Sequence, residues 1–184
     1  MKKEPPITYT MATFLAIGCR FLVVVYYSFA GRISFLEHSL EKAASELPPI
    51  DSADKILIAL LCSILIAPIF EELLFRGLVM GELLKVMRPW AANVSQALVF
   101  GIMHGVLFQS VFAALMGLVL GELYFKTKNI KISMVSHAVF NLSAVLTKDN
   151  LSLSGVTVYS VAGLLLMFLS LYYLYNNAEA DNQD

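Results

Sequence analysis

Apolar residues are gathered along this chain in six long runs, and polar residues mark the short intervals between them. The runs lie at 8–30, 56–84, 90–108, 110–125, 131–147 and 155–175. An α-helix needs about 20 predominantly apolar residues to cross a bilayer, and runs of roughly this length joined by short loops are typical of membrane-spanning helices. The pattern therefore predicts an all-α, polytopic membrane protein with about six transmembrane helices in one bundle.

The same pattern divides the chain into three regions. Residues 1–55 hold the first predicted helix and an exposed loop, 56–147 hold the four central helices, and 148–184 hold the last helix and an acidic tail. The loop part of the first region contains a Pro-Pro pair and has room for one short amphipathic helix. The first helix carries Arg20 and is as long as a full span, so we interpret it as retained rather than as a signal peptide.

Composition supports a lipid-embedded protein and narrows its partners. The chain of 184 residues is 58% hydrophobic and 15% charged, with a mean hydropathy of +0.73, far from the balance of soluble domains. With a net charge of -1 it lacks the basic surface that nucleic acid requires, so we expect membrane lipid and not nucleic acid as a partner. Cys19 and Cys62 lie inside apolar runs and are interpreted as small hydrophobic residues.

Loop charges indicate the orientation, because the cytoplasmic side of a multi-pass protein carries the excess of Lys and Arg. With the N-terminus inside, that side holds seven: Lys2, Lys3, Lys85, Arg88, Lys126, Lys128 and Lys131. The opposite side holds four: Arg32, Lys42, Lys55 and Lys148. Both termini are therefore predicted to be cytoplasmic, and the short chain favours a bacterial plasma membrane.

Charged residues inside a predicted span mark candidate functional sites, because each costs at least ~2.5 kcal/mol at a helix centre by insertion scales. The second run contains Glu71, Glu72 and Arg76. Glu72 and Arg76 are four residues apart, share a helix face and are predicted to form a buried ion pair. Glu71 points about 100° away and is the spare carboxylate, available as a general base. The alternative is that both glutamates clamp Arg76 as a packing device.

Two further pairs with the same spacing lie on later helices. Phe100 and His104 are four residues apart in the third run, and His137 and Asn141 are four apart in the fifth. Each pair is expected to project from one helix face. A single helical histidine is more often a core residue than a catalyst, but several costly polar groups are best explained if they compensate one another. We predict that His104, His137 and Asn141 converge on Glu71 around one water-accessible cavity.

The three motifs form a specific combination: Glu-Glu-x-x-x-Arg, then Phe-x-x-x-His, then His-x-x-x-Asn, each on its own predicted helix. This combination resembles the pattern of the CAAX protease and bacteriocin-processing family, also called CPBP or Abi. The resemblance covers about Ile56 to Leu146, and Gly117 to Thr127 is similar to that family's segment between its histidine motifs. It implies that 56–147 is the catalytic core of an intramembrane endopeptidase.

The resemblance also implies a role for each residue. Glu71 would activate the attacking water, with His104 assisting. His137 and Asn141 would hold the water or stabilise the oxyanion. The structural support would come from three further residues: Glu72, Arg76 and Phe100. Amide hydrolysis needs such a set whatever the family, because it requires a base for water, donors for the oxyanion and an acid for the leaving amine.

The metal requirement stays open on the sequence alone. Glu71, His104 and His137 are a ligand set that zinc (Zn²⁺) accepts, with a fourth position for water. However, the chain has no His-Glu-x-x-His helix, and Asn141 is a poor zinc ligand. Zinc is therefore a candidate cofactor, and a metal-free glutamate mechanism stands beside it.

Two other functions are compatible with the same polar residues. A transporter or proton-coupled channel could use buried Glu, His and Asn as a polar pathway, although the sequence shows no matching pair of broken helices. A non-catalytic immunity or partner-binding protein could keep the fold alone, and bacteriocin self-immunity is compatible with an active protease as well. For a protease, the candidate substrates are prenylated CAAX tails, other peptide or lipidated-peptide precursors, and bacteriocins.

Overall fold

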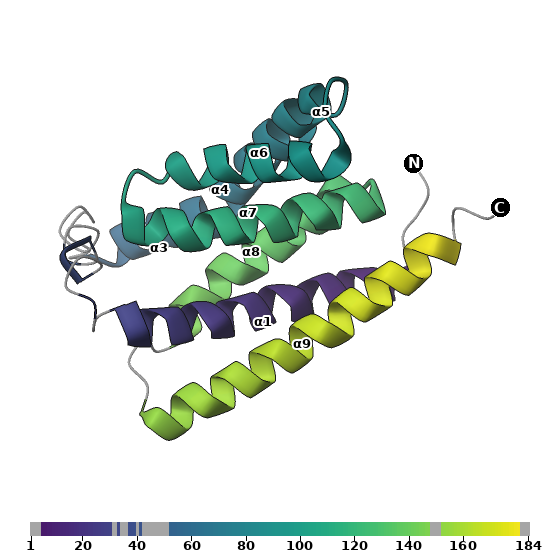
Figure 1. The fold of residues 1–184 in the computed structure, drawn as a ribbon. Helices are drawn as coiled ribbons and strands as arrows, with labels where there is room; N and C mark the ends of the chain where they lie inside the picture. Colours follow the sequence, from purple (N-terminus) through teal and green to yellow (C-terminus); the bar gives the residue numbers. More distant parts are fainter. Residues whose placement is uncertain are drawn as a thin grey trace.

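The regular structure is helical throughout the described part of the chain. The computed structural model describes residues 5–30, 33, 37–39, 41, 52–147 and 152–180, with the side chains of 178–180 excepted. The long helical segments in Figure 1 are α1 (Pro6–Ala30), a composite helix at 53–83, α6 (Pro89–Ile102), α7 (Leu107–Thr127), α8 (Ile130–Leu146) and α9 (Leu153–Ala180). The predicted all-α class is confirmed. Within 31–55, where a short helix was expected, residues 37–39 and 41 are helical, and most of the remainder, like the end of the acidic tail, lies outside the described residues.

Helix lengths bear on the number of membrane crossings. Four described segments are long and apolar enough to span: Pro6–Ala30, Ala53–Leu83, Leu107–Thr127 and Leu153–Asn177. α8 is apolar but has 17 residues, and α6 has 14. A helix of the latter length is about 21 Å long, less than the ~30 Å hydrocarbon core of a bilayer. The polytopic prediction is confirmed, while six complete crossings stay a prediction.

The composite helix is continuous, and two π-helical stretches interrupt its α-helical hydrogen-bond register. Its parts are α3 (Ala53–Leu61), η1 (Cys62–Ile66), α4 (Ala67–Glu72), η2 (Leu73–Val79) and α5 (Met80–Leu83), of which η1 and η2 are π-helical. Ser52 caps its start by accepting a hydrogen bond from the N–H of Lys55. Pro68 has no N–H to donate and is the second residue after η1, which accounts for the change of register at the end of η1. The two π-helical stretches flank the turn that carries Glu71 and Glu72.

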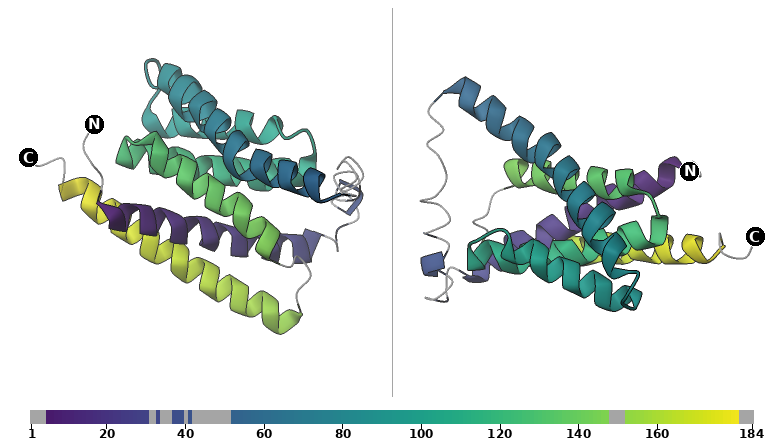
Figure 2. Two further views of the ribbon diagram at one scale, coloured as in Figure 1. Left: turned by 180° about the vertical axis from the view of Figure 1, so that it is seen from behind. Right: turned by 90° about the horizontal axis from the view of Figure 1, so that it is seen from above.

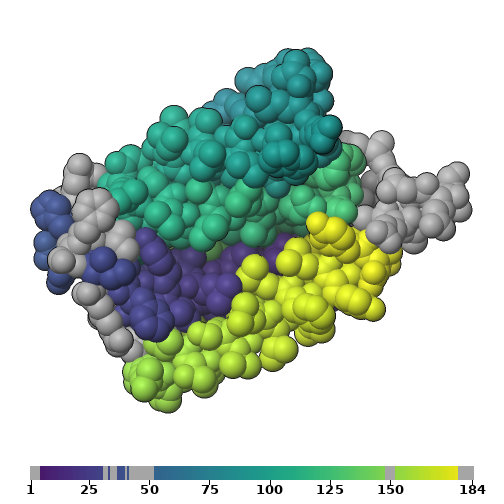
Figure 3. Space-filling model, in the orientation of Figure 1, coloured from purple at the N-terminus to yellow at the C-terminus, as the bar shows by residue number. Residues whose placement is uncertain are grey.

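The helices pack around α8. α1 lies along α9 and also contacts α8, α6 lies along α7, and α8 contacts α1, α7 and the composite helix (Figures 1 and 2). The composite helix crosses the others obliquely, as the view from above shows (Figure 2). Two glycines permit the close crossing of α1 and α9, because a Cβ on Gly18 would lie 2.9 Å from the carbonyl oxygen of Gly163. In Figure 3 the yellow α9 covers the adjoining part of the purple α1.

The connection between α6 and α7 corrects the sequence-based prediction. A single helix was expected from 90 to 108, but α6 ends at Ile102 and His104 lies in the following turn. Gly105 adopts φ +74°, a left-handed conformation that glycine accepts readily and that breaks the helix. The expectation that Phe100 and His104 share a helix face is therefore wrong, although the turn still brings the two side chains together.

Polar residues away from the three motifs have partners of their own. The Nε of Arg20 donates to the hydroxyl of Thr147 at 2.8 Å, so this buried arginine ties α1 to the end of α8. Glu122 and Lys126, four residues apart on α7, both contact Tyr175 on α9. The tyrosine hydroxyl donates to Glu122 Oε1 at 2.7 Å, and the Lys126 Nζ lies 3.8 Å from the ring centroid. These contacts fix the periphery of the bundle and leave the motif residues as the polar centre.

Candidate active site

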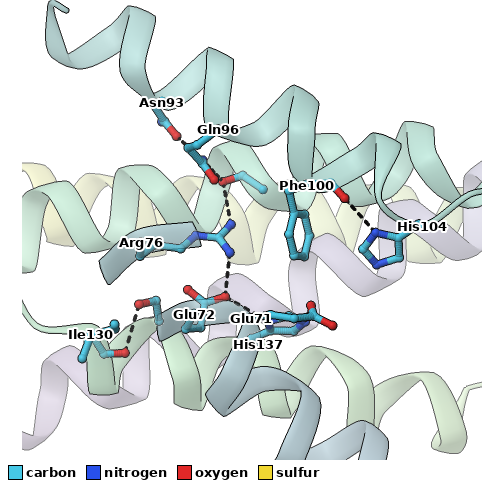
Figure 4. A network of polar contacts seen from close by, with 11 residues as sticks. Glu71, Glu72, Arg76, Asn93, Gln96, Phe100, His104, Ile130 and His137 are labelled. Atoms are coloured by element: carbon cyan, nitrogen blue, oxygen red, sulfur yellow. Dashed lines mark hydrogen bonds and ion pairs between the residues drawn. The ribbon is translucent and has the colours of Figure 1, made fainter. Parts of the chain in front are cut away.

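The buried base of the site is the ion pair between Glu72 and Arg76. The Arg76 Nη1 donates to Glu72 Oε1 at 2.8 Å, and both side chains are completely buried. The pairing predicted from the spacing is therefore present. The other end of the guanidinium donates from Nη2 to the carbonyl of Gly117 at 3.0 Å, and its central carbon lies 4.8 Å from the centroid of the Phe100 ring. Arg76 is thus held from α4, α6 and α7 at once (Figure 4).

His137 connects this ion pair to Glu71. Its Nδ1 lies 2.9 Å from Glu72 Oε1, and its Nε2 lies 3.7 Å from Glu71 Oε2. Because a carboxylate can only accept, the Nδ1 carries a hydrogen and donates it to Glu72. In the neutral ring the Nε2 lone pair then faces Glu71, and 3.7 Å is longer than a direct hydrogen bond. The distance between His137 and Glu71 thus suits a bridging water better than a direct hydrogen bond.

The two neighbouring glutamates differ sharply in access to solvent. The Glu71 side chain is 32% exposed, whereas the Glu72 side chain is fully buried. Successive helical residues point about 100° apart, which is enough here to turn one carboxylate into the core and the other towards the edge of the bundle. Glu71 is therefore accessible from outside the bundle, and Glu72 is not.

Phe100 separates the two histidines of the site. Its ring centroid lies 4.9 Å from that of His104, 5.9 Å from that of His137 and 5.0 Å from that of Phe75. The His104 Nδ1 lies 2.9 Å from the Phe100 carbonyl oxygen, so this nitrogen donates and leaves the Nε2 lone pair available. No hydrogen bond or ion pair joins His104 to Glu71 within the described residues. His104 is placed beside the site (Figure 4), with its contact to Glu71 still a prediction.

Asn141 contacts the backbone of the composite helix. Its Nδ2 donates to the carbonyl of Ser63 at 2.7 Å. In an α- or π-helical register that carbonyl would bond to the N–H of residue 67 or 68. The N–H of Ala67 bonds instead to Cys62, and Pro68 has none. Asn141 therefore supplies the donor that the Ser63 carbonyl lacks within its own helix. A carbonyl inside a membrane needs such a donor. This bond uses one of the two amide hydrogens of Asn141.

The ligand geometry fits the predicted metal set only in part. Glu71 and His137 face each other, and a carboxylate behind the histidine, as Glu72 is here, is a common partner of metal-bound imidazoles. Among the residues that the structure describes, however, no three His, Cys, Asp or Glu side chains are grouped closely enough to hold a metal. His104 is therefore not assembled with the other two into a three-ligand cluster, so the described residues do not fit the predicted zinc site.

Sequence reasoning missed part of the polar network. Gln96 and Asn93 on α6 are buried and bond to each other and to carbonyls of α7. Their spacing of three residues inside an apolar run is the same kind of signal that identified the motif residues. This amide network could have been predicted from the sequence, because burying unpaired amides in lipid is costly and two of them on one helix face therefore indicate a polar contact. The Ser63 carbonyl could not, because a backbone acceptor leaves no mark in the sequence.

Comparisons with known proteins identify relatives of this chain among membrane peptidases. Residues 53–143, about half of the chain, match a sequence model of the family described as type II CAAX prenyl endopeptidase Rce1-like. The chain is also 25% identical over 132 residues to a Bacillus subtilis (strain 168) protein named "Putative membrane peptidase YdiL". That alignment covers 71% of this chain and 54% of the relative, so the chain spans about half the length of the curated relative it matches. No solved structure matches the chain.

An all-helical membrane protein whose charged residues meet at one buried centre belongs to the class of polytopic proteins with an intramembrane polar site. The matched segment contains all three motifs, from the paired glutamates to Asn141. The chain belongs to the CPBP family of CAAX-type membrane proteases.

Proposed function

We propose that this protein is an intramembrane endopeptidase in which Glu71 activates the water that attacks a peptide bond. The observation that carries the proposal is the contrast within α4. The Glu71 carboxylate is 32% exposed and lies 3.7 Å from a histidine nitrogen, whereas the adjacent Glu72 is enclosed in an ion pair. A general base has to reach the proton that it removes, and only the first glutamate can do so.

In the first step, water adds to the scissile carbonyl. A water held between Glu71 Oε2 and His137 Nε2 gives a proton to Glu71 while its oxygen bonds to the carbonyl carbon. The carbonyl oxygen takes up the negative charge. The Nε2 lone pair of His104 assists the proton transfer, because the Nδ1 hydrogen of that ring is donated to the Phe100 carbonyl.

In the second step, the carbon–nitrogen bond breaks and the amine leaves. Glu71, protonated in the first step, returns the proton to the leaving nitrogen. Asn141 keeps a second amide hydrogen besides the one given to Ser63, and we assign it to the oxyanion. Glu72 and Arg76 make no bond to the reacting atoms and instead hold His137 in place.

The substrate is a peptide presented at the membrane. The family description names prenyl endopeptidases, and the composite helix that carries Glu71 is long and apolar enough to span a membrane, so a lipidated CAAX-type tail is the first candidate. Peptide or bacteriocin precursors are the second candidate, and a role in bacteriocin self-immunity would use the same hydrolysis. The two candidates differ in whether the lipid group of the peptide is required for cleavage.

We also propose that both termini lie in the cytoplasm of a bacterium and that the protein is in its plasma membrane. The support is the excess of Lys and Arg in the loops on that side. When reporters are fused after Asn176, a reporter that works only in the cytoplasm is expected to be active, and one that works only in the periplasm is expected to be inactive. A periplasmic report from these fusions would reverse the orientation.

The test uses the purified full chain in phospholipid nanodiscs and a quenched fluorescent peptide with a prenylated CAAX terminus, paired with the same peptide unprenylated. The wild-type protein is expected to cleave the prenylated peptide. Glu71→Gln is expected to lower the rate by about 10²- to 10⁴-fold, the usual contribution of a general base.

The matched control is Glu82→Gln. Glu82 is on the same composite helix but lies on the surface, where it pairs with Lys85 at 2.6 Å with both side chains more than 60% exposed. This variant is expected to cleave at the wild-type rate. Normal cleavage by folded Glu71→Gln protein would overturn the assignment. Absence of cleavage in the wild type, together with solute flux in proteoliposomes, would favour the transporter alternative.

A further inference from the structure

We propose that Gln96, with Asn93 behind it, is a positioning residue that fixes the Arg76 guanidinium and, through it, the histidine of the site. We call Gln96 and Asn93 the amide pair. The inference rests on the proposed function for its catalytic consequence, but its structural part can be tested without any activity. The amide pair touches none of the groups assigned to the reaction, so its effect has to pass through the buried network.

The amide pair binds the backbone of α7 from α6. The Gln96 Nε2 donates to the Gly117 carbonyl at 2.9 Å and to Asn93 Oδ1 at 2.8 Å. The Asn93 Nδ2 donates in turn to the carbonyl of Leu118 at 3.1 Å. Gln96 is completely buried, and Figure 4 shows its amide directed at the Arg76 end of the network. Each bond is therefore made in a low-dielectric interior, where an amide is held firmly in one geometry.

The network converges on one atom, the carbonyl oxygen of Gly117. It accepts from Arg76 Nη2 at 3.0 Å as well as from Gln96 Nε2 at 2.9 Å. Glu72 holds the opposite end of the guanidinium, at Nη1. The planar guanidinium is thus fixed at two corners, one of which depends on an α7 carbonyl that the amide pair orients.

Two glycines on α7 make room for this arrangement. A Cβ on Gly121 would overlap Asn93 Oδ1 and lie 2.6 Å from Gln96 Nε2. A Cβ on Gly117 would lie 3.1 Å from the Cα of Ala97, in the helix that bears the amide pair. The two glycines of this Gly-x-x-x-Gly sequence on α7 therefore leave space for the amide side chains between two closely packed helices.

The position of His137 follows from the same chain of contacts. The Glu72 oxygen that accepts from Arg76 is also the oxygen that lies 2.9 Å from His137 Nδ1. A shift of the guanidinium therefore moves the acceptor that orients the imidazole. The competing explanation is that the amide pair only joins α6 to α7, as buried amides often do in membrane bundles. The two explanations differ in what they predict for the histidine ring.

The experiment exploits the small number of histidines. The chain contains three, so selective ¹⁵N-histidine labelling of the full protein in nanodiscs gives signals from His38, His104 and His137 alone. His38→Ala and His104→Ala assign them. The test variant is Gln96→Met, which keeps the side-chain length and removes the amide. The control is Gln109→Met, since Gln109 is a half-buried glutamine of α7 outside the network.

Gln96→Met is expected to shift the ring nitrogen signals of His137 and to leave those of His38 and His104 in place. With the peptide substrate, it is expected to lower kcat by about 10- to 100-fold with an unchanged KM, as a slightly misplaced catalytic group would. The Gln109→Met control is expected to alter neither the ring signals nor kcat. Unmoved His137 signals in folded Gln96→Met protein would overturn the proposal even if the wild type is an active protease.

A second variant keeps the proposal testable if Gln96→Met does not fold. Asn93→Ala removes one of the two acceptors of the Gln96 amide and leaves its bond to Gly117 possible. It is expected to shift the His137 signals in the same direction by a smaller amount. Folded Asn93→Ala protein with wild-type His137 signals contradicts the positioning role. A protease assay that fails for the wild type, with the shifts present, contradicts the proposed function alone.

Discussion

The two sides of the site differ in how completely their polar groups are enclosed. On the closed side, Glu72 and Arg76 are fully buried and bonded to groups from α7 and α8, and the ring of Phe100 on α6 lies against the guanidinium. On the open side, Glu71 is 32% exposed, and its Oε2 lies 3.7 Å from the Nε2 of His137. One helix turn thus supplies both a buried support and a carboxylate that is accessible from outside the bundle.

This difference shows why adjacent glutamates are not interchangeable. A buried ion pair adds little net stability over an apolar pair of similar size, but removing one partner leaves an uncompensated charge in the core. Evolution can therefore use Glu72 to orient His137 at little cost. Glu71 has the opposite requirement, because a base that is completely bonded has no lone pair for the substrate water.

The largest effect is expected from Glu72→Gln, which breaks the closed side. It leaves Arg76 as an unpaired buried cation and is expected to cost about 3–5 kcal/mol in the free energy of unfolding. Denaturant or thermal unfolding in detergent measures this loss, with Glu82→Gln as the exposed control. A Glu72→Gln protein as stable as the control would mean that water or another group already compensates Arg76.

A double variant sharpens the same test. Glu72→Leu combined with Arg76→Met removes both charges and is expected to recover most of the stability that Glu72→Gln loses, because no buried charge remains. Proteolysis is expected to stay low, since His137 has lost its carboxylate partner. Recovery of activity together with stability would show that His137 does not need Glu72.

The next effect concerns the open side. His104→Ala is expected to lower kcat by about 10²-fold, in the range of an assisting acid–base group, with no measurable change in the unfolding transition. His104 is half-buried in the α6–α7 turn, so its removal opens no core cavity. His38→Ala provides the surface control. A loss of stability without a loss of kcat would make His104 a capping residue for the Phe100 carbonyl.

A smaller effect is expected from Asn141→Leu. It leaves the Ser63 carbonyl without the donor that replaces the N–H missing at Pro68, at a cost of about 1–3 kcal/mol in unfolding free energy. Kinetics are expected to worsen as well, because the composite helix carries Glu71 about two turns later. Asn177→Ala is the matched control, since that amide donates to an exposed carbonyl of its own helix. An Asn141→Leu protein with normal stability would return this residue to a purely catalytic role.

The smallest effect is expected from metal removal. Dialysis of the active protein against a strong chelator is expected to change kcat by less than about twofold, because the structure groups two and not three of the predicted zinc ligands. The same protein dialysed without chelator is the reference. A loss of activity that added zinc restores would establish a metal requirement and contradict the metal-free mechanism.

Much of the fold could be predicted because lipid leaves a strong pattern. Continuous apolar runs located the helices to within a few residues, and the i, i+4 spacing identified the Glu72–Arg76 pair, since both depend on local geometry. The end of α6 was misplaced because an apolar run does not reveal the left-handed conformation of Gly105. The partner of Asn141 was missed because it is the backbone carbonyl of Ser63, which lacks a helical donor at Pro68. The spacing of residue types along the chain does not predict a tertiary contact of this kind.

The claim that two adjacent glutamates have separate roles is tested most directly by measuring kcat and the unfolding midpoint of Glu71→Gln and Glu72→Gln in one nanodisc preparation. We expect Glu71→Gln to lose about 10³-fold in kcat while its midpoint stays at the wild-type value. Glu72→Gln is expected to lose both activity and stability. Equal losses of stability in the two variants, or normal kcat in Glu71→Gln, would contradict the account.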